Sequence, residues 1–295
     1  MRFCIRDDDV NYFTTPDELL ACYDQIWKKY PVTFALVSRI KGDWPRWVST
    51  IYKMREQTDW DAWNADDDEH PIGANTSLVT FLKAQLALKR VDLAFHACHH
   101  RNSEFKKSVK LKHNYIQGAE FFVNNDVSGL IKQEINYLNA LFGYSISCFT
   151  PPQNVLSEMG YKSVIKAGLN LCGGGVSSLR KEKTLAGIKN ILRQTAFRIM
   201  NHAYDYPYVL RYSRHNEIIH HYPLHPDTRL DNLISAFERV RRFDGDFVIS
   251  THYVEHKYPT TYHNGTSMGV VFKRFIEYVD QYPDVSPVTM TELLS

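Results

Sequence analysis

Two short polar clusters in this sequence carry the residue types that bind metals and move protons. The first is the acidic run Asp7–Asp9, which directly follows the apolar residues Phe3–Ile5. The second contains His96 and His100, four residues apart with His99 between them, at the end of another apolar run. Adjacent carboxylates repel one another unless a cation or a catalytic task holds them. Imidazoles at this spacing suit zinc and similar divalent ions.

Each cluster also has a simpler interpretation. On its own, the acidic run is compatible with a solvated turn, and the histidine run with a surface loop. The metal site is favoured because both clusters follow predicted strands of the same chain. In parallel α/β folds the carboxyl ends of the strands gather at one rim, where side chains distant in the sequence meet.

The chemistry that such a site supports is metal-assisted hydrolysis. Neighbouring aspartates on an extended backbone point in different directions, so one can bind the metal while the other moves a proton. One Asp and two His leave open positions for water and a substrate oxygen. A bound ion lowers the pKa of water to ~7 and polarises a carbonyl. His252, which follows the apolar run Phe247–Thr251, would protonate the leaving group. Alternatively, His252 only hydrogen-bonds within a loop that contains Glu255 and His256.

The elements that must position these residues alternate between buried strands and amphipathic helices, a pattern typical of a mostly parallel sheet. The pattern predicts strands at 2–6, 32–37, 91–95, 145–149, 169–171 and 247–251. It predicts helices near 16–27, 45–56, 76–89, 115–142, 155–167 and 266–281. The Tyr- and His-rich region 185–225 is expected to form irregular strands and loops, with His220 and His221 in structural roles.

Composition narrows the class of protein. A length of 295 residues suits one α/β barrel, and the net charge of +2 gives no electrostatic footprint for nucleic acid. Five cysteines, with no Cys-x-x-Cys pair, argue against a disulfide framework or a thiolate zinc cluster. No run approaches the ~18 apolar residues of a membrane helix, and no leader pattern precedes the first strand. We therefore expect a soluble, cytoplasmic protein.

The motifs resemble those of the polysaccharide deacetylases, the family 4 carbohydrate esterases, in order along most of the chain. Asp8-Asp9-Val10 is similar to the family's first motif, and the segment from His96 to His100 is similar to its second. The resemblance implies Asp8 as general base and a metal held by Asp9, His96 and His100. The segment Val248–His252 is similar to a later motif and implies His252 as general acid.

The sequence departs from the family pattern at several points. Asp7 leaves the register of the acidic run open by one residue, and His99 is an alternative ligand. The third motif is matched only loosely, by Phe149–Asn154, and lacks the arginine that orients the base in many members; Arg6 is a candidate substitute. The family's fourth motif has no clear counterpart in this sequence.

Together, these observations predict one polysaccharide-deacetylase-like catalytic domain over residues 1–295, folded as a distorted (β/α) barrel. The expected activity is metal-dependent hydrolysis, with zinc as the metal. The expected substrate is an N-acetylated or N-formylated amino sugar of a surface polysaccharide or its precursor. Two alternatives remain open: a catalytically silent carbohydrate-binding relative, and a hydrolase of amides that are not sugars.

Overall fold

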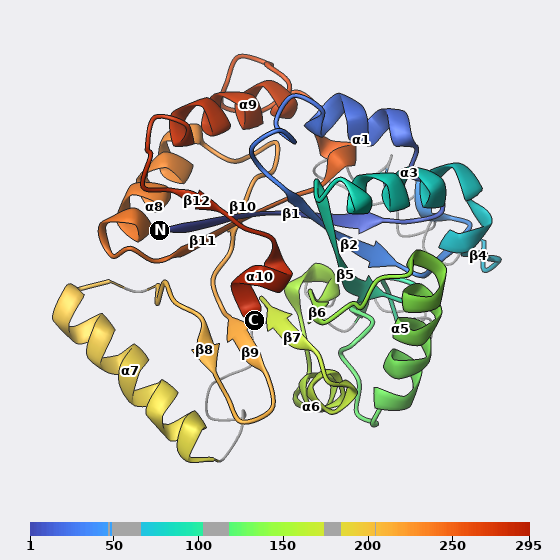
Figure 1. Cartoon of the computed structure of the whole chain (residues 1–295), viewed down its shortest axis with the longest axis horizontal. Coiled ribbons are helices and arrows are strands. Elements are labelled where there is room, and N and C mark those ends of the chain that lie inside the picture. The colour runs from blue at the N-terminus through green and yellow to red at the C-terminus, as the bar shows by residue number, and fades with distance from the viewer. Residues whose placement is uncertain (47, 49–65, 103–117, 174–183, 204) are drawn as a thin grey trace.

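The apolar runs of the sequence form a curled sheet with helices on its outer side (Figure 1). The structure, a computed structural model, describes residues 1–46, 48, 66–102, 118–173, 184–203 and 205–295. The strands are β1 (Arg2–Val10), β2 (Val32–Val37), β3 (Arg39–Lys41), β4 (Glu69–Pro71), β5 (Val91–Ala97), β6 (Cys148–Phe149), β7 (Asn170–Cys172), β8 (Leu210–Arg211), β9 (Asn216–Ile218), β10 (Tyr222–Pro223), β11 (Asp246–Thr251) and β12 (Ser286–Pro287). The α-helices are α1 (Pro16–Tyr23), α3 (Thr76–Ala87), α5 (Ser128–Phe142), α6 (Glu158–Ala167), α7 (Leu185–Asn201), α8 (Leu230–Arg242), α9 (Met268–Val279) and α10 (Met290–Leu294).

The main sheet runs in the order β10-β11-β1-β2-β5-β6-β7-β9-β8, and β12 also pairs with β1. All of these pairs are parallel except β8 with β9. Because β11, β1, β2 and β5 are neighbours that point the same way, their carboxyl ends share one rim. The sheet curls into a half-barrel with an open side, which is the distorted barrel that the sequence predicted.

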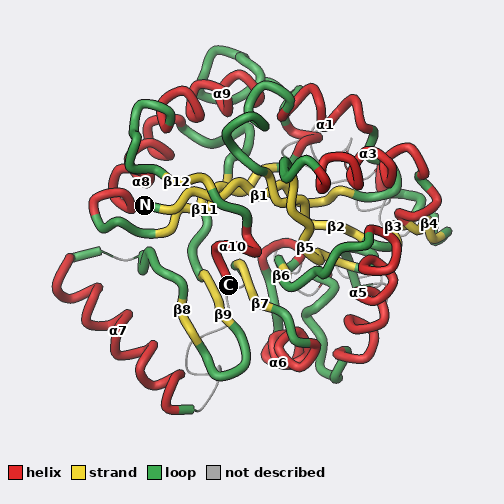
Figure 2. Tube along the Cα trace, viewed as in Figure 1, coloured by secondary structure: helices red, strands yellow, loops and turns green. Residues whose placement is uncertain are grey.

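The two faces of the sheet carry different side chains because alternate residues of a strand point to opposite sides. Helices surround the outer side of the sheet (Figure 2). This face is rich in large aromatic residues such as Phe3, Phe34 and Phe247, which belong to one hydrophobic cluster with residues of the helices. The inner face carries small residues instead, namely Cys4, Ala35, Ala94, Cys148, Cys172 and Val248. These small side chains leave room inside the curl for the last helix, α10.

Helix α10 fills the inside of the curled sheet with Met290, Leu293 and Leu294, each at most 1% exposed. Its first turn is held by the buried carboxylate of Asp92 on β5. This carboxylate accepts hydrogen bonds from the backbone N–H of Thr291 at 3.0 Å and from its hydroxyl at 2.9 Å. The apolar side of α10 is therefore part of the core.

The structure corrects the sequence-based expectations at three places. Residues 185–201, expected to be irregular, form helix α7, and α8 was not predicted at all. Within the described residues, the helix expected over 115–142 begins only at Ser128. The helix expected near 45–56 lies mostly outside the described residues.

Replacing Leu293 with alanine tests the role of α10. Leu293 is almost fully buried, so truncation should lower the free energy of unfolding by about 2–5 kcal/mol. Leu185→Ala is the matched control, because Leu185 is 86% exposed and its loss should change stability by less than about 0.5 kcal/mol. Urea unfolding followed by circular dichroism measures both. Equal stability of the two variants would contradict a packed barrel interior.

Candidate metal centre

The three aspartates at the end of β1 point in three different directions. Asp7 faces the outer helix layer, where the hydroxyl of Tyr23 donates a hydrogen bond to its carboxylate. Burial raises the pKa of the Asp7 carboxyl well above its usual value, although the Tyr23 hydrogen bond opposes this. Asp8 faces the inside of the curl, and Asp9 sits in a left-handed backbone conformation (φ 74°) at the rim. The single acidic run thus supplies three different environments.

Asp8 forms a buried ion pair with Arg6, two residues earlier on the same face of β1. Nη2 of Arg6 lies 2.6 Å from Oδ2 of Asp8, and neither side chain is more than 4% exposed. Burial alone would raise the pKa of Asp8, but the charge of Arg6 outweighs it and lowers that pKa. Asp8 is therefore ionised at neutral pH. Arg6, considered above as a substitute for the arginine missing from the third motif, therefore contacts Asp8 directly.

Arg6 is itself held by two further groups. Its guanidinium donates to Oδ1 of Asn154 at 3.0 Å and to the carbonyl oxygen of Cys172 at 3.3 Å. Gly173, next to Cys172, has a positive φ of 84°, and a Cβ there would lie 3.3 Å from both Asn154 Oδ1 and His221 Nδ1. A glycine is thus suited to this crowded position beside the site.

Asp9, His96 and His100 bring three potential ligand atoms together. Oδ1 of Asp9 lies 3.1 Å from Nε2 of His96 and 3.0 Å from Nε2 of His100, and all three residues are buried. Within the described residues, this carboxylate oxygen has no partner with hydrogen-bond geometry. A buried oxygen without such a bond calls for an explanation, and a cation between it and the two ring nitrogens is one that these residues can supply. One carboxylate and two imidazoles fit a divalent ion such as zinc.

His96 is oriented by Thr150, which follows β6. Nδ1 of His96 lies 2.8 Å from the carbonyl oxygen of Thr150, which can only accept a hydrogen bond. The hydroxyl oxygen of Thr150 lies at the same 2.8 Å from Nδ1, and the two contacts orient the ring so that Nε2 faces Asp9. Metal-binding histidines generally need such a partner on the second nitrogen.

The turn that carries His100 is held by one carboxylate, Glu120. It accepts hydrogen bonds from three consecutive backbone N–H groups, those of Cys98, His99 and His100, at 2.7 to 3.0 Å. His100 has a left-handed backbone (φ 71°), a conformation that costs energy in a residue with a side chain and persists only where the surroundings enforce it. Glu120 supplies that enforcement.

His99, considered as an alternative ligand, points elsewhere. Its Nε2 lies 2.8 Å from Oε1 of Glu69 on β4, and the residue lies outside the group of potential ligands formed by Asp9, His96 and His100.

His252 follows β11 and faces the same centre from the other side. Its Nε2 lies 3.6 Å from Oδ2 of Asp9, and its Nδ1 lies 3.2 Å from Oε2 of Glu255. Burial opposes the charged form, but the Glu255 carboxylate outweighs it and raises the pKa of His252 to about 10. The same contact lowers the pKa of Glu255 to about 2. The imidazole of His252 is therefore cationic at neutral pH in the metal-free protein.

His225 shares Glu255 with His252. Its Nδ1 lies 2.9 Å from Oε2 of Glu255, and the two imidazole rings stack with centroids 5.4 Å apart. These three residues form a second group of potential metal ligands. However, both Nδ1 atoms already make hydrogen bonds with this carboxylate, whereas the contacts of Asp9 Oδ1 with His96 and His100 are of similar length but lack hydrogen-bond geometry.

Sequence reasoning named Arg6 and Glu255 but missed the contacts of Glu120 and Thr150 with the histidines. Glu120 and Thr150 carry no recognisable spacing, because each contacts a histidine distant in the sequence. Glu255 was named only in the alternative interpretation of His252 as a loop residue, and the structure shows its contact with Nδ1 of His252. His221 also lies beside the site, next to Arg6 and Asn154, and burial lowers its pKa to about 3, so it is neutral.

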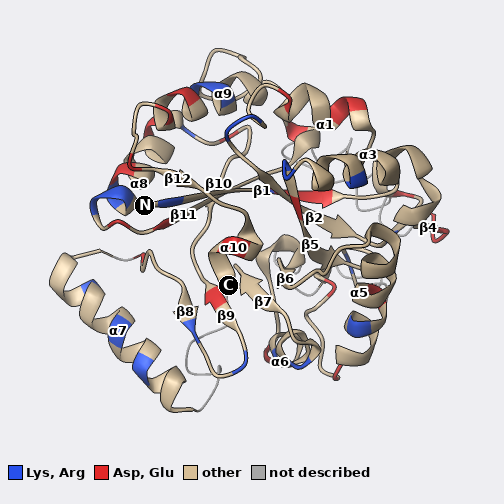
Figure 3. Ribbon diagram, in the orientation of Figure 1, with Lys and Arg blue, Asp and Glu red and all other residues tan. Residues whose placement is uncertain are grey.

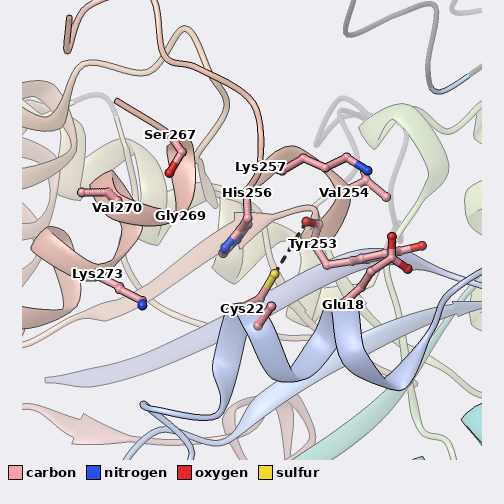
Figure 4. A pocket seen from close by; sticks show the side chains of 11 residues that line it. Glu18, Cys22, Tyr253, Val254, His256, Lys257, Ser267, Gly269, Val270 and Lys273 are labelled. Carbon is pink, nitrogen blue, oxygen red and sulfur yellow. Dashed lines mark hydrogen bonds between the residues drawn. The ribbon is translucent and has the colours of Figure 1, made fainter. Parts of the chain in front are cut away.

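A separate cavity of about 320 Å³ lies behind the His252 turn, between α1 and α9 (Figure 4). Cys22 lies on its wall, and its thiol is 3.6 Å from the carbonyl oxygen of Tyr253. Burial raises the pKa of this thiol, so it is not a nucleophile at neutral pH. The cavity lies on the helix side of the sheet, away from the candidate centre.

Glu255→Gln tests the electrostatic origin of the charge on His252. Removing the carboxylate should bring the pKa of His252 in metal-free protein down from about 10 toward the ordinary value near 6.5. Histidine side-chain NMR signals followed over pH measure the change. Glu158→Gln is the control, because Glu158 pairs with Lys162 on the surface of α6. An unchanged pKa in the Glu255 variant would show that another group holds the charge.

Comparison with known proteins gives no match by sequence: no protein-family model and no curated protein matches this chain. Solved structures do match. A Mycobacterium smegmatis protein designated a polysaccharide deacetylase aligns with 98% of this chain and 88% of its own, at 11% identity and a TM-score of 0.50. A family 4 acetyl xylan esterase from Clostridium thermocellum, solved with a cobalt ion, aligns with 99% of this chain and 90% of its own, at 13% identity and a TM-score of 0.40.

A 4-alpha-glucanotransferase from Thermococcus litoralis aligns with 99% of this chain, at 10% identity and a TM-score of 0.49, and this chain spans only 40% of its length. At such low identities the similarity is evidence for the fold alone. That evidence comes from the M. smegmatis structure. The resemblance that the motifs suggested is confirmed at that level. The chain has an α/β fold with the curled, distorted barrel of the polysaccharide deacetylases.

Proposed function

We propose that this protein is a metal-dependent hydrolase that removes an N-acyl group, acetyl or formyl, from an amino sugar. One observation carries the proposal. A metal-ligand group (Asp9, His96 and His100), an ionised carboxylate (Asp8) and a cationic imidazole (His252) converge on one rim from three strands. This is the complement of groups that hydrolysis of an unactivated amide requires.

In this proposal, each residue has one task. Asp9, His96 and His100 hold a divalent ion, zinc by ligand type, which when bound polarises the acyl carbonyl and acidifies water. Asp8 accepts the proton of the attacking water, and Arg6 keeps its carboxylate ionised and fixed in direction. His252 donates a proton to the departing nitrogen as the C–N bond breaks, giving a carboxylic acid and a free amine. Glu255 keeps His252 protonated before the reaction.

The choice of an amide follows from the proton donor. An amine is a very poor leaving group unless it is protonated, whereas an activated ester needs no acid. The amino sugar is proposed from the fold and from the motifs at its rim. We further propose that residues 1–295 act as one catalytic domain in the cytoplasm, on a surface polysaccharide or its precursor.

The metal is tested first. Purified protein loaded with zinc should hold about one ion per chain, and His96→Ala or His100→Ala should lose it, because two protein ligands bind far more weakly than three. Elemental analysis after dialysis measures the content. His99→Ala is the matched control and should retain the metal. A wild-type protein that binds no zinc would favour the catalytically silent carbohydrate-binding alternative.

Asp8→Asn separates binding from chemistry. The substitution is nearly isosteric and spares all three ligands, so the metal should remain while turnover falls by ~10²–10⁴-fold, the usual contribution of a general base. Release of acetate or formate from N-acylated amino sugars is the measurement, with zinc content determined on the same samples. Near-normal turnover would assign proton transfer to another group.

His252→Ala tests the general acid. Hydrolysis of the amide should fall by ~10²–10⁴-fold, whereas an activated aryl ester should still be cleaved because its leaving group needs no proton. The two substrates are compared on one preparation with its metal content measured. An equal loss on both would show that His252 supports the site in another way. Failure to release acyl groups from any amino sugar, with release from other amides, would overturn the sugar assignment.

A further inference from the structure

Helix α7 presents an apolar stripe to solvent. Leu185, Ile188, Leu192 and Ile199 recur at spacings of three, four and seven residues, which places them on one side of a helix. Leu185 is 86% exposed and Leu192 64% exposed. With Met200, this helix carries five of the ten large apolar side chains that are exposed on the described part of the chain. A concentration of this kind on one element marks an interaction surface.

The opposite side of α7 packs against the rest of the protein, so the apolar stripe is held facing the solvent. Gly187, Asn190, Gln194 and Phe197 are its buried residues. Nδ2 of Asn190 donates to the carbonyl oxygen of Arg211 at 2.9 Å. The ring of Phe197 packs edge-on against Phe243, with centroids 5.0 Å apart. The helix therefore cannot turn its apolar side inward without breaking these contacts.

The charges of α7 are all of one sign. Its sequence contains Lys189, Arg193 and Arg198 and no acidic residue, and Figure 3 shows only basic residues coloured along it. Lys189 and Arg193 are four residues apart, so they lie together along one edge of the apolar stripe. The helix is also set at the periphery of the molecule, beside β8, where a flat surface can reach it (Figure 1).

We propose that α7 binds the surface of an anionic lipid bilayer, with its apolar stripe among the headgroups and its basic residues against lipid phosphates. An exposed apolar face flanked by Lys and Arg is the pattern of helices that lie in the membrane interface. A second copy of this chain fits less well, because a two-fold contact of α7 with itself would bring cations together without an acidic partner on the helix. No helix among the described residues is long and apolar enough to cross a membrane. The inference does not depend on the proposed enzymatic function.

Vesicle cosedimentation tests this proposal with the full-length protein. Wild-type protein should sediment with vesicles rich in phosphatidylglycerol, and much less with phosphatidylcholine vesicles or at high salt. The double variant Ile188→Ser, Leu192→Ser should weaken binding by about tenfold or more, because it removes the centre of the stripe. Lys189→Gln and Arg193→Gln should each weaken it by about fivefold. Leu130→Ser, at a 45% exposed position on α5, is the matched control and should bind normally.

A second experiment leaves the other apolar side chains of α7 in place. Leu192→Cys, labelled with a polarity-sensitive fluorophore, should shift to shorter wavelength on phosphatidylglycerol vesicles, whereas the same label at position 130 should not. Three outcomes would overturn the proposal: no sedimentation of the wild-type protein, equal binding of the double variant, or no spectral shift at position 192. A dimer that light scattering shows to dissociate in the double variant, without vesicle binding, would assign the stripe to a second copy.

Discussion

A carboxylate buried at the end of β1 is the constraint around which the candidate site is built. Asp9 is 6% exposed, and a buried charge is tolerated only when other groups compensate it. Burial would raise its pKa, but His100 and His96 outweigh that effect and hold the pKa well below its usual value. The imidazole of His252 faces its second oxygen. A cation bound by Asp9, His96 and His100 would neutralise the remaining charge of this carboxylate. The same ion would supply the proposed chemistry.

The residues that orient the site come from segments spread along the chain. Thr150 orients the ring of His96, Glu120 holds the turn of His100, and Glu255 contacts His252. The parallel sheet brings these segments together because its strands end at one rim. Small residues on the inner face leave room for α10, whose side chains fill the inside of the curled sheet. Preorganisation of this kind is what lets a few side chains move protons efficiently.

The sequence predicted those parts of the structure that depend on consecutive residues. Buried strands such as β2 and β5, and the placement of polar residues after them, follow from short apolar runs. Contacts between distant segments were not predictable, as the pairing of Glu120 with the turn of His100 illustrates. Helix α7 was missed for a different reason. Its buried side includes Gly187, Asn190 and Gln194 while leucine and isoleucine face outward, which inverts the usual pattern.

One diffraction measurement tests the central claim, that Asp9, His96 and His100 form a metal site facing Asp8 and His252. Crystals of the zinc-loaded protein, with data collected on both sides of the zinc absorption edge, locate the ion independently of any assay. The account predicts a single anomalous peak within about 2.0–2.2 Å of Nε2 of His96, Nε2 of His100 and a carboxylate oxygen of Asp9. A peak between His225, His252 and Glu255 instead, or no peak at either group, would contradict it.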